Sequence, residues 1–211
     1  MVNMVELIPV WFYLITSVIF SAAIIGFLVS YFAFRTYRMT KNKSHLFLSL
    51  SFLIIGLGFV ALSSTSIYIY TTLELYKGSS VSLNLLNYLG FRIYYILSSI
   101  GYILLTLIYL PKKFMNKLFI FYVPIWYASS FNFHVFSIVL VLLVMIRSIV
   151  NSIKRKNFDS YLVTVAFVCL LIFHSLLLLT AFSQSMYITA NVFLITGFLS
   201  LLLMLIRVNF K

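Results

Sequence analysis

Apolar runs long enough to cross a bilayer recur along the whole chain and are separated by short polar segments. Because these runs are continuous rather than alternating, they predict membrane-spanning helices and not the strands of a membrane barrel. The sequence therefore predicts an all-α integral membrane protein that forms a single transmembrane domain over residues 1–211. We expect seven spans, over residues 8–34, 46–70, 88–110, 111–128, 133–150, 161–182 and 186–206.

The number of spans depends on the 29-residue apolar run 118–146. As one helix, this run gives six spans and divides the basic residues seven against eight. As a tight hairpin that turns at 129–132, it gives seven spans and puts 13 of the 15 basic residues on one side. The positive-inside rule then favours a seven-helix bundle with its N-terminus outside and its C-terminus in the cytoplasm. Trp11 and Trp126 would both lie at the outer interface, where tryptophan is enriched.

Composition supports the membrane assignment and narrows the partners. Hydrophobic residues make up 64% of the chain and charged residues only 9%, with a mean hydropathy of +1.14, which excludes an ordinary soluble domain. The net charge of +12 is explained by topology and by attraction to anionic lipids, so membrane lipids and not nucleic acid are the expected partners. No basic segment precedes the first run, and we expect that span to be retained.

Acidic residues are few, and this limits the possible chemistry. Glu6, Glu74 and Asp159 are the only carboxylates, and none falls inside a predicted span. Ion-coupled carriers and pumps usually bind their ion at an intramembrane carboxylate. The sequence also lacks the motifs of serine hydrolases and zinc proteases. It therefore suggests no catalytic residue and no metal site, and a non-enzymatic role is favoured.

Two histidines are the candidate cofactor ligands. His174 is the one ionisable side chain well inside a predicted span, and His134 lies on the neighbouring span. Together they could ligate a b-type haem. By helix rise, however, His174 would lie roughly 12 Å below the surface and His134 only roughly 3 Å, so haem would require a tilt or a helix break. The alternative is that His174 hydrogen-bonds a hydroxyl or carbonyl group of an adjacent helix.

A polar cluster on the third span is a candidate ligand pocket. Arg92 lies near its predicted outer end and is followed by several hydroxyl groups. These groups could line an outward-facing pocket for a quinone headgroup or a small anion. Alternatively, Arg92 extends to the interface or pairs with a glutamate, while the hydroxyls bond between helices. The candidate pocket residues are Arg92, Tyr95, Ser98, Ser99 and Tyr102, with Tyr94 beside them.

Small residues predict close helix packing in the first two spans. Ala22, Gly26 and Ser30 are spaced by four, and Gly56 and Gly58 each belong to a seven-residue stripe of small residues. Such spacings allow neighbouring backbones to approach closely. We expect these two spans to pack against each other or against another subunit.

Three functional hypotheses remain open. The first is a membrane-embedded anchor, accessory or sensor-like subunit of a larger membrane complex. The second is an electron-transfer subunit that binds b-type haem or quinone near His174. The third is a uniporter or facilitator of a small solute. The hairpin over residues 32–59 resembles those that open many small prokaryotic multi-span proteins, which implies a prokaryotic plasma membrane.

Overall fold

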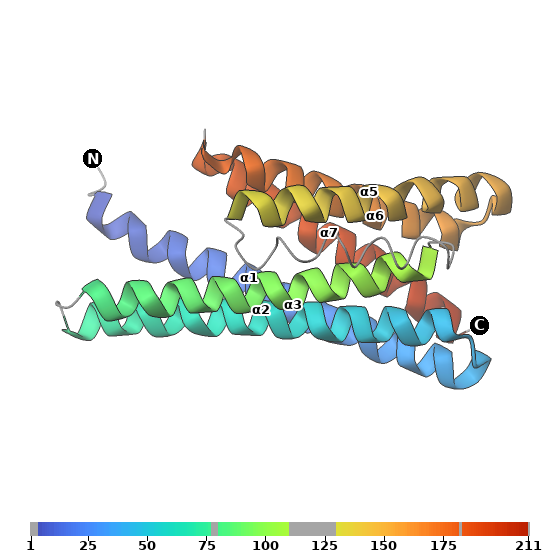
Figure 1. Cartoon of the computed structure of the whole chain (residues 1–211), viewed down its shortest axis with the longest axis horizontal. Coiled ribbons are helices and arrows are strands. Elements are labelled where there is room, and N and C mark those ends of the chain that lie inside the picture. The colour runs from blue at the N-terminus through green and yellow to red at the C-terminus, as the bar shows by residue number, and fades with distance from the viewer. Residues whose placement is uncertain (1–3, 77–79, 110–129, 182, 211) are drawn as a thin grey trace.

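The computed structural model describes residues 4–76, 80–109, 130–181 and 183–210, and this part of the chain is helical apart from short turns. Figure 1 shows the arrangement of the helices. Their bounds are α1 Met4–Thr40, α2 Lys43–Tyr76, α3 Ser80–Tyr109, α5 Ser130–Arg155, α6 Phe158–Leu178 and α7 Gln184–Asn209, with a 3-10 turn η2 at Leu179–Ala181.

Six helices within the described residues are long and apolar enough to cross a membrane. This result supports the prediction of an all-α, multi-pass membrane protein. The predicted span over 111–128, and Trp126 with it, lies outside the described residues, as does the side chain of Trp11. The described helices match the other six predicted spans, although several extend beyond the predicted ends.

The helices form a closed ring of neighbours. Within the first trio, α2 packs against both α1 and α3, and within the second trio, α6 packs against both α5 and α7. The ring is closed by contacts of α1 with α7 and of α3 with α5. Figure 1 shows α2 and α3 along one side of the bundle and α5 and α6 along the other. Every helix therefore faces a shared central axis.

One end of the bundle, here called the basic end, contains two turns of the same construction. In each turn a lysine with positive φ follows a helix: Lys41 at 54° and Lys156 at 47°. An asparagine comes next and caps the following helix. Asn42 Oδ1 accepts from the Ser44 amide at 3.0 Å, and Asn157 Oδ1 accepts from the Ser160 amide at 2.8 Å. Asparagine is a preferred N-cap because its side chain satisfies an otherwise unpaired amide.

The small residues of α1 and α2 pack within the chain. A Cβ atom added to Gly26 would lie 3.6 Å from the Gly56 Cα, so the two backbones are nearly in contact. One turn further, Ser30 Oγ lies 3.1 Å from Ser49 Oγ. Gly58 instead faces α3, where an added Cβ would lie 3.2 Å from Ser98 Oγ. These small residues therefore join helices of the same molecule.

Candidate functional site

A chain of hydrogen bonds in the interior of the bundle joins three helices. His174 of α6 is fully buried, and its Nε2 lies 2.8 Å from the Tyr102 hydroxyl of α3. Its other ring nitrogen, Nδ1, lies 3.1 Å from Nδ1 of His134 on α5. The prediction that the two histidines lie at different depths is therefore wrong. We call these three residues the His–His–Tyr chain.

The helix ends explain why the two histidines meet. α5 begins at Ser130 and α6 ends at Leu178, so each histidine lies four residues from the end of its helix. The depth estimate placed the end of the sixth span at residue 182, but the chain leaves the α-helix earlier, in η2. Because α5 and α6 are antiparallel neighbours, equal distances from these ends bring the two side chains to the same level.

This arrangement does not fit a haem between the two histidines. In a bis-histidine haem, the iron and the porphyrin plane lie between the two ligating nitrogens. Here the imidazoles are in direct hydrogen-bond contact and their ring centroids are 5.4 Å apart. Across the described residues, no group of three or more His, Cys, Asp or Glu side chains could hold a metal ion.

His134 also lines a cavity of about 100 Å³ at the end of the bundle opposite the basic end. Three tyrosines lie in its wall, so we call it the tyrosine cavity. A volume of 100 Å³ is about three times the share of one water molecule in the liquid, which suits water or a very small solute. The wall includes one or more residues from every helix of the ring: Ile19, Phe59, Leu62, Phe91, Tyr94, Tyr95, His134, Phe173, Tyr187 and Asn191.

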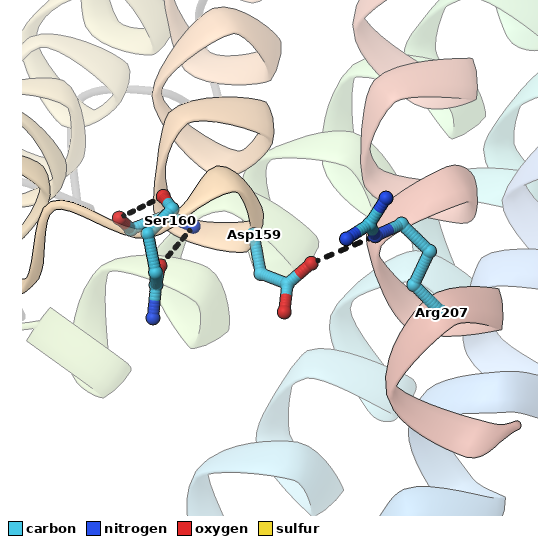
Figure 2. Close-up of polar contacts among 4 residues, drawn as sticks. Asp159, Ser160 and Arg207 are labelled. Atoms are coloured by element: carbon cyan, nitrogen blue, oxygen red, sulfur yellow. Dashed lines mark hydrogen bonds and ion pairs between the residues drawn. The ribbon is translucent and has the colours of Figure 1, made fainter. Parts of the chain in front are cut away.

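A larger cavity of about 520 Å³ lies at the basic end. Its volume falls within the range of about 300–1,000 Å³ that is typical of ligand sites. Polar residues of the two Lys–Asn turns meet apolar residues from α2, α3, α6 and α7 in its wall. Asp159 belongs to this wall and is ion-paired with Arg207 Nε at 3.1 Å (Figure 2). We call this larger cavity the basic-end cavity.

A buried layer separates the two cavities. On α2, Phe59 lines the tyrosine cavity and Leu48 the basic-end cavity, while the fully buried Phe52 lies between them. The same order recurs on the other helices that reach both cavities. By helix rise the layer is about 15–20 Å thick. Its fully buried members include Phe52, Tyr102, Leu105, Val141, Phe167, Leu170 and Phe198.

The predicted pocket residues lie in four different places. Tyr95 lines the tyrosine cavity and Tyr102 belongs to the His–His–Tyr chain. Ser98 and Ser99 are buried in the core, and the Ser99 hydroxyl has no hydrogen-bond partner among the described residues. Arg92 does not appear in the described wall of the cavity. Its guanidinium donates to the Tyr88 hydroxyl, one turn earlier on α3.

Sequence reasoning missed the polar residues that α7 contributes. Tyr187 and Asn191 line the tyrosine cavity and lie one helical turn apart. That spacing places two polar groups on one face of an otherwise apolar span. The sequence could therefore have predicted a polar face on this helix. The second missed residue is Asn209, whose Nδ2 donates to Thr36 Oγ1 at 2.8 Å and so joins the end of α7 to α1.

The chain matches no protein-family model, no curated protein and no solved structure. The functional argument therefore rests on the two cavities, the layer between them and the His–His–Tyr chain.

Proposed function

We propose that the chain is a passive facilitator, or uniporter, that moves a small uncharged solute across a prokaryotic plasma membrane. The observation that carries this proposal is the pair of cavities at opposite ends of the bundle. One lies at each end of the bundle, both have walls from the two trios, and a buried layer closes the path between them. Many transporters bind substrate between two such sets of helices and expose it alternately to each side by rocking.

The carboxylates argue for transport that is not driven by ions. Asp159 lies in the first turn of α6 at the basic end, where Arg207 pairs with it. Glu6 precedes the first apolar run of the sequence, and Glu74 follows the second. Binding of a coupling ion inside the membrane usually requires a buried carboxylate. A solute that moves down its own gradient needs none.

The proposed topology has seven spans, with the N-terminus outside and the C-terminus in the cytoplasm. Tyr109 lines the basic-end cavity and Ser130 the tyrosine cavity, so the segment between them connects opposite ends of the bundle. Within the described part of the chain, Arg92 is the one basic residue away from the basic end. The positive-inside rule then assigns the basic end to the cytoplasm.

Solute flux into proteoliposomes without an ion gradient tests the proposal. Stopped-flow light scattering would compare urea, glycerol, erythritol and glucose with protein-free liposomes. We expect faster entry of one or more of these solutes. Asn151→Trp places a large side chain in the wall of the basic-end cavity, and should slow entry. Val150→Trp is the matched control, because Val150 is an exposed apolar residue of the same helix. Entry of all four solutes at the protein-free rate would refute a facilitator.

The other two functional hypotheses remain predictions. The complex-subunit hypothesis drew on Ala22, Gly26 and Ser30, and these residues are buried within the chain. Partner polypeptides in native mass spectrometry of the gently extracted protein would support it. The electron-transfer hypothesis, for which the contact between His134 and His174 leaves no space for a haem between them, predicts the ultraviolet absorbance of a bound quinone.

A further inference from the structure

The two trios of helices correspond to each other in helix order, in helix contacts and at several residue positions. The Lys41–Asn42 turn after α1 has the same construction as the Lys156–Asn157 turn after α5, an offset of 115 positions. In the order of the ring, α1 corresponds to α5, α2 to α6 and α3 to α7. In this correspondence, the contact of α3 with α5 is equivalent to the contact of α7 with α1. The ring therefore has the contacts expected of two related units.

Two glycines provide independent evidence for this correspondence. A Cβ added to Gly101 of α3 would lie 2.9 Å from the Ser51 carbonyl oxygen and would overlap the Ile55 side chain. A Cβ added to Gly197 of α7 would lie 3.0 Å from the Ala166 carbonyl oxygen and 3.6 Å from Leu170 Cγ. Ser51 and Ala166, like Ile55 and Leu170, are related by the same offset of 115. A close glycine contact between the second and third helices is thus equivalent in both units.

The His–His–Tyr chain is a place where the two units differ. Tyr102 follows Gly101, and its equivalent after Gly197 is Phe198, an offset of 96 positions between the third helices of the two units. By the offset of 115, the equivalents of His174 and His134 are Phe59 and Ile19. Phe59 and Phe198 pack with ring centroids 6.1 Å apart, whereas the rings of Tyr102 and His174 are 5.1 Å apart and share a hydrogen bond.

This difference serves as an internal control on the role of the polar groups. At the equivalent place the same scaffold closes with Ile19, Phe59 and Phe198, all buried. Packing of the unit therefore does not require polar side chains there. Burial of polar groups is unfavourable unless they are paired, and ionisable residues within spans mark functional sites. The polar substitutions are best explained by a ligand.

The order of the hydrogen bonds determines what the chain presents to the cavity. The Tyr102 hydroxyl can donate to His174 Nε2, which makes His174 the Nδ1–H tautomer. His174 Nδ1–H then donates to His134 Nδ1, so that His134 carries its proton on Nε2. The reverse order would leave the buried Tyr102 proton without an acceptor among the described groups. His134 lines the tyrosine cavity, and its remaining ring nitrogen is a donor.

We propose that His134, His174 and Tyr102 form a recognition site in the tyrosine cavity for an uncharged solute with a hydrogen-bond-accepting oxygen, such as a carbonyl or hydroxyl. The site rests on the proposed facilitator function, because the cavity is one end of the solute path. His134 contacts the solute. His174 and Tyr102 are positioning residues that fix the tautomer of His134.

Two measurements on the full chain distinguish this site from the transport function. In nanodiscs that contain ¹⁵N-histidine protein, urea or glycerol is titrated while the imidazole nitrogen signals are recorded. The His134 signals are those lost in His134→Ile. We expect the His134 Nε2 signal to move with solute, and Tyr102→Phe to change its tautomer ratio. If neither urea nor glycerol shifts the His134 signals, the proposed site is overturned, whether or not solute flux is observed.

Flux measurements then use a variant that copies the apolar counterpart. The triple variant His134→Ile, His174→Phe and Tyr102→Phe should raise the solute concentration for half-maximal flux about 3- to 10-fold, the effect of one lost hydrogen bond. Thr196→Ala is the control, because its exposed hydroxyl bonds only within α7. Equal flux constants in the triple variant and wild type would overturn the site. A solute-dependent His134 signal without any flux would refute the facilitator and leave the site standing.

Discussion

Replacing Tyr102 by phenylalanine would remove one hydroxyl group from the centre of the bundle and keep the ring. Tyr102 is 1% exposed and His174 is 0% exposed, so no water replaces the lost partner of His174 Nε2. An unsatisfied buried acceptor costs about 1–3 kcal/mol, but interhelical hydrogen bonds in membranes average about 0.6 kcal/mol. We therefore expect Tyr102→Phe to lower the free energy of unfolding by about 1 kcal/mol.

Further replacements should restore the lost stability. His174→Phe removes the unsatisfied nitrogen, and His134→Ile then removes the last member of the chain. Replacing all partners of a hydrogen bond by apolar groups can be nearly neutral or stabilising. The triple variant should therefore be at least as stable as Tyr102→Phe alone, because its side chains are those of the equivalent apolar site. The three effects would be strongly non-additive, as expected for residues in contact.

The single cysteine provides the assay. Cys169 is 6% exposed in α6 and is the sole thiol of the chain, so a thiol-reactive fluorogenic dye reports unfolding on heating or in denaturing detergent. Wild type, Tyr102→Phe and the triple variant would be compared in the same detergent. The reasoning is wrong if Tyr102→Phe unfolds at the same temperature or detergent concentration as wild type, or if the triple variant is the least stable of the three proteins.

Three further predictions follow from packing, charge and topology. Gly101→Ala should destabilise the protein by about 1–3 kcal/mol, because the added Cβ overlaps α2. Gly26→Ala should be neutral or stabilising by up to about 1 kcal/mol, because the atom nearest to its added Cβ is 3.5 Å away. The dye assay measures both, and equal effects would contradict the close contact. Asp159→Asn should cost less than about 1 kcal/mol, because the ion pair is partly exposed, and a larger loss in the same assay would show that it is not a surface pair. In a cysteine-free background, an impermeant maleimide should label Ser183→Cys in intact cells and Lys156→Cys only after permeabilisation; the opposite pattern would invert the proposed orientation.

Hydropathy predicted an all-helical membrane protein correctly because the membrane requires long apolar segments, but it could not locate the ends of the helices. The end of α6 shows why. The residues of η2, Leu179–Ala181, are mostly apolar like those of the helix before them, so nothing in their hydropathy signals the change from α to 3-10 geometry. The error in that end placed His174 too deep relative to His134. The predicted end of this span lay four residues beyond the end of α6, and for that reason the contact between His174 and His134 was not predicted.

The internal correspondence was also out of reach of the sequence. Aligned by the offset of 115, the first two helices of the two units share Lys-Asn turns and a few apolar residues, such as Phe52 and Phe167. Apolar identities between spans arise easily because the membrane restricts composition to few residue types. The glycine contacts identify the relationship, and these depend on which carbonyl oxygen each glycine faces across to the neighbouring helix. That information is three-dimensional.

The two Lys–Asn turns have a consequence for how the protein enters its membrane. Lys41 and Lys156 hold left-handed backbone conformations, in which a non-glycine residue is less stable than glycine by about 1 kcal/mol. Glycine would relax both turns. Each lysine, however, adds a positive charge beside a helix end, and charges there determine which side of a span is retained during insertion. Lysine-to-glycine variants should therefore be harder to unfold once inserted, yet a larger fraction of the chains would insert upside down. In the proposed topology, the two lysines would favour a cytoplasmic position of their turns and would lower the stability of the folded protein.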